Sequence, residues 1–129
     1  MAISVIKSPQ SPNPIGPYSH AVEVKSHQGM IFTSGQVALN AETGEMVQDS
    51  IASETKQVME NLKKILHSAG VDFTNVVKST IFLTNLDDFA EVNEMYGNYF
   101  QGEYPARETV QVVRLPRNAR VEISMIAVV

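Results

Sequence analysis

The chain has 129 residues, a formal net charge of −4 and no cysteine. This length suits one domain with a core of its own and leaves little room for a second. The acidic balance offers a nucleic acid no overall attraction, and the lack of cysteine excludes disulfides, thiol nucleophiles and thiolate metal ligands. No segment has the pattern of a signal peptide, and no apolar run approaches the ~20 residues that cross a bilayer. We therefore expect a cytoplasmic protein.

The first quarter of the chain predicts short strands around a stiff loop. A short edge strand is expected over residues 2–7. The next segment, SPQSPNPIGP, holds four of the six prolines and excludes regular structure. This proline-rich loop leads directly to Tyr18, whose hydroxyl it can place. Two more strands are predicted over residues 20–25 and 30–34.

Two helices are predicted in the centre of the chain. The first is capped by Ser50 or Asp49 and ended by Gly70. Its apolar face carries Ile51, Val58, Leu62, Ile65, Leu66 and Ala69. The β-branched run over residues 75–84 predicts a half-buried strand. Asn85 then caps the second helix, which has acidic residues in its first turn. Its buried side carries Phe89, Val92, Tyr96 and Phe100.

Two final strands are predicted over residues 109–115 and 119–128, joined by a hairpin turn near residue 117. The order strand-strand-strand-helix-strand-helix-strand-strand indicates an α+β sandwich with both helices on one sheet face. The last strand is apolar on one face and mostly apolar on the other, so both faces need cover. Two helices cover one face only, and we expect further copies of the chain to cover the other.

Two charged residues stand out as candidates for a site. Arg107 follows a proline at the start of a strand, and its guanidinium matches a carboxylate with two parallel hydrogen bonds. An ordinary ion pair or a solvated side chain is the alternative. Glu122 is the one charge on a mostly apolar strand face, which is costly unless it is paired or functional. The spacing of the two residues about the turn makes them poor cross-strand partners, so they would meet more readily across a subunit boundary.

Other candidates are weaker on their own. Ser34 and Gly35 end a strand where a backbone could approach a ligand, although a tight turn explains them equally well. Asn93 lies near the apolar side of the second helix, where an amide usually satisfies loop backbone groups. No dinucleotide-binding, phosphate-loop, nucleophile-elbow or zinc-protease motif is present, and the three histidines lack ligand spacing. We expect neither a metal nor a cofactor.

Five segments in this order, IGPYSHAV, IFTSGQV, DDFAEVNEMYGNYF, PARETVQVVRLP and VEISMIAV, resemble the RidA (YjgF/YER057c/UK114) family. The resemblance runs from about residue 8 to the C-terminus. It implies one RidA-like domain over residues 1–129 with a chorismate-mutase-like fold. It also implies a homotrimer whose sheets close around a central barrel, with sites in the clefts between subunits.

The implied activity is that of a 2-iminobutanoate/2-iminopropanoate deaminase. Such enzymes hydrolyse the enamine or imine products of pyridoxal-phosphate-dependent dehydratases to 2-oxo acids and ammonia. Two alternatives stay open: a non-catalytic protein that binds small carboxylates, and an endoribonuclease or translation inhibitor. The acidic balance and the lack of a histidine pair in the motifs disfavour the nuclease.

The resemblance also implies roles for single residues. Arg107 would bind the substrate carboxylate, and Glu122 and Tyr18 would take part in catalysis. The rest of the pocket would be formed by Ser34, Gly35, Phe89 and Thr109. Many family members read PARSCV where this chain reads PARETV, so thiol chemistry cannot be required here. We expect Glu108 to add negative charge beside Arg107.

Overall fold

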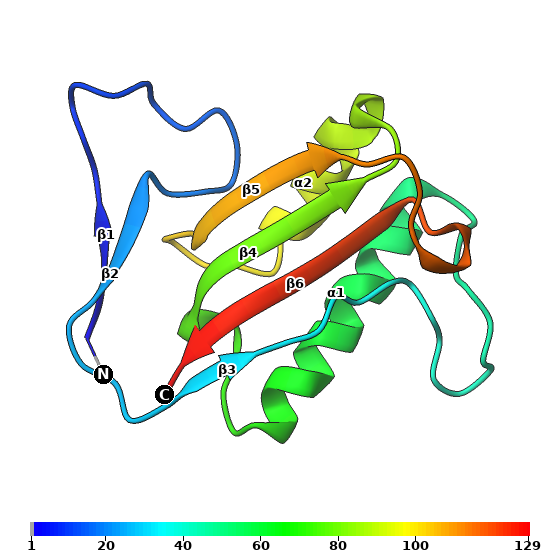
Figure 1. Cartoon of the computed structure of the whole chain (residues 1–129), viewed down its shortest axis with the longest axis horizontal. Coiled ribbons are helices and arrows are strands. Elements are labelled where there is room, and N and C mark those ends of the chain that lie inside the picture. Colours follow the sequence, from blue (N-terminus) through cyan, green and yellow to red (C-terminus); the bar gives the residue numbers. More distant parts are fainter. Residues whose placement is uncertain (1) are drawn as a thin grey trace.

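The computed structural model describes residues 2–129, which fold around a four-stranded sheet. The strand order is β3-β6-β4-β5, with bounds Met30–Phe32, Val121–Val128, Val76–Leu83 and Ala106–Gln111. Strand β6 runs antiparallel to β3 and β4, whereas β5 runs parallel to β4. A parallel neighbour requires a crossover connection, which α2 (Phe89–Gly97) provides. A separate two-stranded sheet, β1 (Ile3–Ile6) and β2 (Ala21–Val24), stands beside the larger one (Figure 1).

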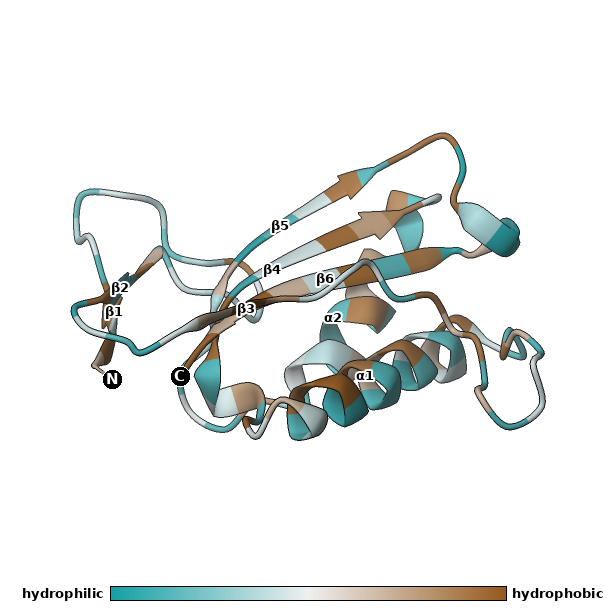
Figure 2. Cartoon of the chain, turned by 60° about the horizontal axis from the view of Figure 1, so that its bottom comes forward, coloured by the Kyte–Doolittle hydropathy of each residue, from teal (hydrophilic) through white to brown (hydrophobic). Residues whose placement is uncertain are grey.

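Both helices pack on the same face of the larger sheet (Figure 2). Helix α1 spans Ile51–Ser68, and the side chain of Ser50 accepts a hydrogen bond from the N–H of Ser53 as its N-cap. Gly70, with φ of 79°, follows the helix in the left-handed conformation that favours glycine. Short 3-10 turns lie at Phe73–Asn75, Leu86–Asp88 and Pro116–Asn118.

The core lies between these helices and one face of the sheet. Alternate residues of β4 and β6 are buried there, namely Ser79, Ile81, Leu83, Val121, Ile123, Met125 and Ala127. They pack against Val58, Met59, Leu62 and Leu66 of α1 and against Val92 and Tyr96 of α2. Burying one such aliphatic side chain contributes about 1.5–3 kcal/mol, so this layer fixes the positions of β4, β6 and α2.

The other face of the sheet is not covered by any element of residues 2–129 and carries exposed apolar side chains. Phe32 is 67% exposed, Met30 48% and Val110 46%. Single exposed apolar residues are common, but three large ones on one sheet face favour contact with another protein surface. No helix within residues 2–129 is long and apolar enough to cross a membrane.

The predicted order of elements and the placement of both helices on one face are confirmed. The predicted hairpin between the last two strands is wrong, because β4 lies between β5 and β6. Strand β5 also starts earlier than expected, at Ala106, and ends at Gln111. Arg107 is therefore part of the strand rather than its entrance.

Candidate functional site

Arg107 lies on the helix-covered face of the edge strand β5, opposite the buried Ser79 of β4. Its guanidinium carbon is 5.4 Å from the ring centre of Tyr18, 5.7 Å from that of Phe89 and 5.3 Å from that of Tyr96. Each cation–π contact contributes about 0.5–2 kcal/mol, depending on how far water is excluded. Three aromatic rings, one from the proline-rich loop and two from α2, thus form a cage around the guanidinium.

No carboxylate neutralises Arg107 within the described part of the chain. The two ion pairs found among residues 2–129 join Lys78 to Glu108 and Arg120 to Glu54. Burial lowers the pKa of Arg107, although a guanidinium remains protonated in proteins. A partly buried cation without a counter-charge is costly, so this position favours an anionic ligand.

Three buried side-chain atoms lack a hydrogen-bond partner among residues 2–129: Arg107 Nη1, Thr109 Oγ1 and Asn93 Oδ1. Arg107 and Thr109 are two residues apart on β5 and point to the same face. Asn93 follows Phe89 by four residues on α2 and precedes Tyr96 by three, so the three share one side of the helix. Asn93 therefore lies on the helix side that faces the aromatic cage, and Thr109 follows Arg107 on the same face of β5.

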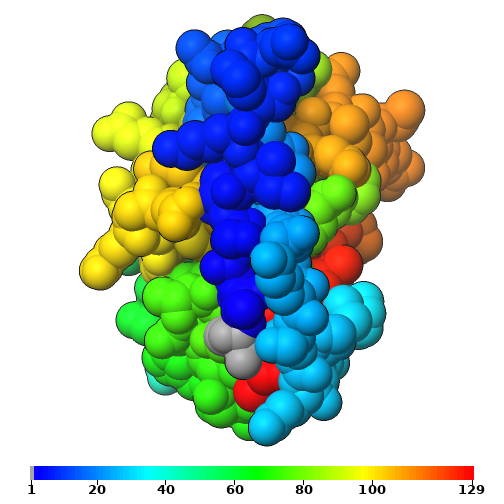
Figure 3. All heavy atoms as spheres, turned by 90° about the vertical axis from the view of Figure 1, so that its left-hand side faces the viewer, coloured from blue at the N-terminus to red at the C-terminus, as the bar shows by residue number. Residues whose placement is uncertain are grey.

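The proline-rich loop covers this group. A Cβ atom on Gly16 would lie 3.3 Å from Asn93 Nδ2 and 3.4 Å from Arg107 Nη2, so a side chain here would press on both groups. Ser19 anchors the end of the loop, because its N–H donates to Pro105 O at 3.1 Å and its hydroxyl to Tyr104 O at 2.5 Å. Figure 3 shows the N-terminal segment and β2 running side by side down this side of the molecule.

Glu122 belongs to a second group, on β6. Gln36 exchanges two backbone hydrogen bonds with Ile123, which brings the segment containing Ser34 and Gly35 alongside β6. A Cβ on Gly35 would overlap the Glu122 carboxylate and lie 2.7 Å from its Cδ. The missing side chain of Gly35 therefore leaves the space that the Glu122 carboxylate occupies.

The residues around Arg107 and the residues around Glu122 lie on opposite faces of the sheet. Phe82 of β4 pairs with Glu122 on one side and with Val110 on the other, so these three side chains share the uncovered face. Arg107 pairs with Ser79 and shares the helix-covered face. The structure thus brings Tyr18, Phe89 and Thr109 together with Arg107, and Ser34 and Gly35 together with Glu122, but it does not join the two groups within one chain.

Two expectations for individual residues are wrong. Glu108 does not add charge beside Arg107, because adjacent strand residues point to opposite faces, and its carboxylate pairs with Lys78 at 2.8 Å. The amide oxygen of Asn93 does not satisfy a loop backbone group, since Oδ1 has no partner among residues 2–129. Sequence reasoning also missed Tyr96, which it assigned only to the core. The spacing of Phe89, Asn93 and Tyr96 on one helix side was the signal available.

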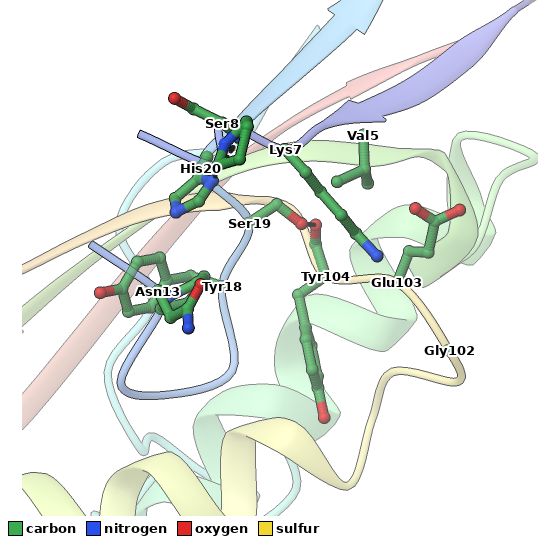
Figure 4. Close-up of a pocket in the computed structure, with 12 residues that line it drawn as sticks. Val5, Lys7, Ser8, Asn13, Tyr18, Ser19, His20, Gly102, Glu103 and Tyr104 are labelled. Atoms are coloured by element: carbon green, nitrogen blue, oxygen red, sulfur yellow. Dashed lines mark hydrogen bonds between the residues drawn. The ribbon is translucent and has the colours of Figure 1, made fainter. Parts of the chain in front are cut away.

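Two surface cavities, of about 470 and 610 Å³, lie near the proline-rich loop and the segment before β5. The smaller is bordered by the ring of Tyr18 and by Lys7, Glu103 and Tyr104 (Figure 4). Neither cavity is lined by Arg107 or by the Glu122 group. Within residues 2–129 no three His, Cys, Asp or Glu side chains form a group that could hold a metal ion.

The sequence and the fold match those of known proteins along almost the whole chain. The Endoribonuclease L-PSP family matches residues 8–129. Protein DfrA of Myxococcus xanthus is 55% identical, over 99% of this chain and 97% of the relative. The 2-iminobutanoate/2-iminopropanoate deaminase of Mus musculus is 49% identical, over 96% of this chain and 90% of the relative.

Solved structures also match the fold of this chain over almost its whole length. RidA from the Antarctic bacterium Psychrobacter superposes with a TM-score of 0.76 at 36% identity, covering 98% of this chain and 99% of the other. TdcF of E. coli, solved with bound serine, superposes with a TM-score of 0.74 at 40% identity, covering 98% of each chain. Several relatives are named imine deaminases, which are hydrolases of C–N bonds, and this confirms the predicted enzyme class. The chain belongs to the RidA/YjgF family, described as Endoribonuclease L-PSP.

Proposed function

We propose that the protein is a 2-iminobutanoate/2-iminopropanoate deaminase. The observation that carries this proposal is Arg107, a caged and partly buried cation without an acidic partner among the described residues. Its two parallel N–H groups fit the carboxylate that every 2-imino acid bears. The names of relatives at 44–49% identity support the same substrate class.

The chemistry that the site must perform is the addition of water to a C=N bond. Arg107 holds the carboxylate and fixes the orientation of the imine carbon, which is electrophilic once the nitrogen is protonated. Glu122 accepts a proton from the attacking water while the C–O bond forms. The proton then passes to the nitrogen, the C–N bond breaks while the new hydroxyl gives its proton to Glu122, and ammonia leaves a 2-oxo acid. Tyr18 and the backbone near Ser34 and Gly35 would hold the polar atoms of the intermediate.

This mechanism requires more than one copy of the chain. Arg107 and Glu122 lie on opposite sheet faces, so a site that uses both must take them from different subunits. We propose a homotrimer in which the uncovered sheet faces surround a central barrel and each boundary joins the Arg107 group of one copy to the Glu122 group of the next. The exposed Phe32 and Val110 on that face support such contacts.

The proposal is tested by coupling a threonine dehydratase to this protein while semicarbazide traps the released imine. We expect the wild-type protein to reduce the yield of semicarbazone. Arg107→Ala should lower this effect by about 10- to 100-fold, the value of one or two charge-assisted hydrogen bonds. Lys25→Ala removes an exposed cation and is the control, with unchanged activity expected. Equal trapping with and without wild-type protein would contradict the proposal.

A carboxylate-binding protein without turnover is the second candidate. Arg107 and the three aromatic rings around it belong to one chain, so binding of a carboxylate alone does not require Glu122. Retained binding of 2-oxobutanoate in a protein that leaves semicarbazone yield unchanged would favour this alternative. The endoribonuclease function is less favoured, because the net charge of −4 opposes RNA binding.

A further inference from the structure

Among residues 2–129, the buried side-chain atoms without a hydrogen-bond partner belong to the face of the sheet and the helix that surround Arg107. The fully or nearly buried polar side chains of the core, Ser19, Glu54, Thr55 and Ser79, all take part in hydrogen bonds. The three buried atoms that lack a partner among residues 2–129 belong to Asn93, Arg107 and Thr109. Leaving such an atom unpaired costs about 1–3 kcal/mol, so these positions point to a ligand that contacts Arg107 and Asn93.

The positions of Asn93 and Arg107 suit contact with one small ligand. Both side chains reach the backbone of Gly16, with Asn93 Nδ2 and Arg107 Nη2 within 3.4 Å of the point where a Cβ on Gly16 would lie. The rings of Phe89 and Tyr96, on the same side of α2 as Asn93, also face the guanidinium. Asn93 is therefore held beside Arg107 by the same loop and helix.

The three atoms differ in the hydrogen bonds they can make. Arg107 Nη1 can only donate, Asn93 Oδ1 can only accept, and the Thr109 hydroxyl can do either. The matching ligand must therefore offer an acceptor to Arg107 and an N–H or O–H donor to Asn93. A 2-imino acid offers a carboxylate and an imine N–H, whereas its 2-oxo acid product has no donor at C2.

We infer that Asn93 recognises the N–H of the substrate and thereby distinguishes the imino acid from the oxo acid. This inference rests on the proposed function and deepens it. The tetrahedral intermediate carries both O–H and N–H groups, so Asn93 still has a partner at that stage. After the C–N bond breaks and ammonia leaves, no group at C2 of the 2-oxo acid can donate to Asn93 Oδ1. Loss of this hydrogen bond weakens product binding and favours product release.

The test compares two stable ligands of equal charge, 2-hydroxybutanoate and 2-oxobutanoate, by calorimetry. They differ at C2, where the first carries an O–H donor and the second does not. We expect the wild-type protein to bind 2-hydroxybutanoate about three- to tenfold more tightly, as one added hydrogen bond predicts. Asn93→Leu, which keeps the approximate shape but not the acceptor, should bind both ligands equally. Asn98→Leu, an exposed asparagine at the end of α2, is the matched control and should keep the preference.

Each other outcome decides against the inference. Equal affinities in the wild-type protein, or tighter binding of 2-oxobutanoate, would show that Asn93 presents no acceptor to the ligand, while the carboxylate site would stand. An equal loss of both affinities in Asn93→Leu, with the preference kept, would make Asn93 structural. Binding of neither ligand by the wild-type protein would overturn the carboxylate site and the inference together. The wild-type comparison needs no variant, so it holds even if Asn93→Leu fails to fold.

Discussion

Arg107 and Glu122 lie on opposite faces of one sheet, on strands that β4 separates. Arg107 shares its face with the helices, and Glu122 shares the uncovered face with Phe82 and Val110. Side chains on opposite faces of a sheet cannot meet, because the backbone layer lies between them. Any chemistry that needs both residues must therefore combine two copies of the chain.

Mixed oligomers should recover activity lost in each single variant. Arg107→Ala keeps Glu122, and Glu122→Gln keeps Arg107, so each pure variant lacks one member at every boundary. When the two are unfolded, mixed in equal amounts and refolded, about one boundary in four joins an intact Arg107 to an intact Glu122. We expect about a quarter of the wild-type activity in the semicarbazide assay. No recovery, with mixed oligomers demonstrated by mass spectrometry, would contradict a site shared between subunits.

Local sequence signals predicted much of the fold. The capping role of Ser50, the left-handed Gly70 just after α1 and the succession of elements follow from helical period, capping chemistry and strand composition. The pairing of β5 was not predictable in the same way. Two consecutive strands favour a hairpin, but β5 pairs in parallel with β4, and this choice depends on how α2 packs across the sheet.

The candidate site was predicted residue by residue but not in its arrangement. A resemblance could indicate Arg107 and Glu122, whereas the opposite faces on which they lie follow from the register of β4 with its neighbours. The same register explains why Glu108 lies away from Arg107, although they are adjacent in the sequence. Asn93 could not be assigned from sequence, because the absence of a partner for its amide oxygen among residues 2–129 is a tertiary property.

Gly35→Ala should reduce turnover more than it reduces stability. The new Cβ would overlap the end of the Glu122 side chain, which can rotate away at a cost of about 1 kcal/mol or less. Displacing the proposed proton acceptor should lower kcat by about 10-fold or more, while KM changes little because Arg107 is untouched. Steady-state kinetics and urea unfolding measure both effects. The control is Gly29→Ala, whose Cβ would meet its nearest atom, Val129 Cγ1, at an ordinary 3.5 Å. A normal kcat in Gly35→Ala would argue against Glu122 as the proton acceptor.

Removing the hydroxyl of Tyr96 should destabilise the fold at neutral pH. Tyr96 is fully buried and donates to Ser79 Oγ at 2.9 Å. Tyr96→Phe leaves Ser79 without this partner and should lower the free energy of unfolding by about 1–2 kcal/mol. The aromatic ring beside Arg107 remains, so affinity for 2-oxobutanoate should be unchanged. A large loss of affinity at unchanged stability would instead give the hydroxyl a role in binding.

Tyr96→Phe should lose less stability than the wild-type protein as the pH rises into the alkaline range. Burial raises the pKa of Tyr96 to about 12, above the ordinary value of 10.0. Below pH 10 the Tyr96 hydroxyl keeps its proton in both the folded and the unfolded protein, so its contribution to stability is complete. Above pH 10 the unfolded state ionises first, so stability falls as pH rises toward 12. Between pH 9 and 11 the wild-type protein should therefore lose about 1 kcal/mol more than Tyr96→Phe. Tyr99, whose pKa is also raised, is present in both proteins. Equal losses of stability in the wild-type protein and in Tyr96→Phe, measured by urea unfolding at each pH, would contradict the raised pKa of Tyr96.

Glu54 should be the acidic residue that matters most for stability. Its side chain is 0% exposed and accepts hydrogen bonds from the Arg120 N–H at 2.8 Å and from Arg120 Nε at 2.7 Å. This pair ties α1 to the residue that precedes β6. Glu54→Ala removes both acceptors, but the Arg120 side chain is 38% exposed and water can reach it, so the cost should be about 2–3 kcal/mol. Glu54→Gln keeps an acceptor of the same shape and should cost less. The exposed pair of Lys78 and Glu108 is the comparison, since Glu108→Ala should cost at most about 1 kcal/mol. Similar losses for Glu54→Ala and Glu108→Ala in urea unfolding would contradict a special role for the buried and multiply hydrogen-bonded Glu54 carboxylate.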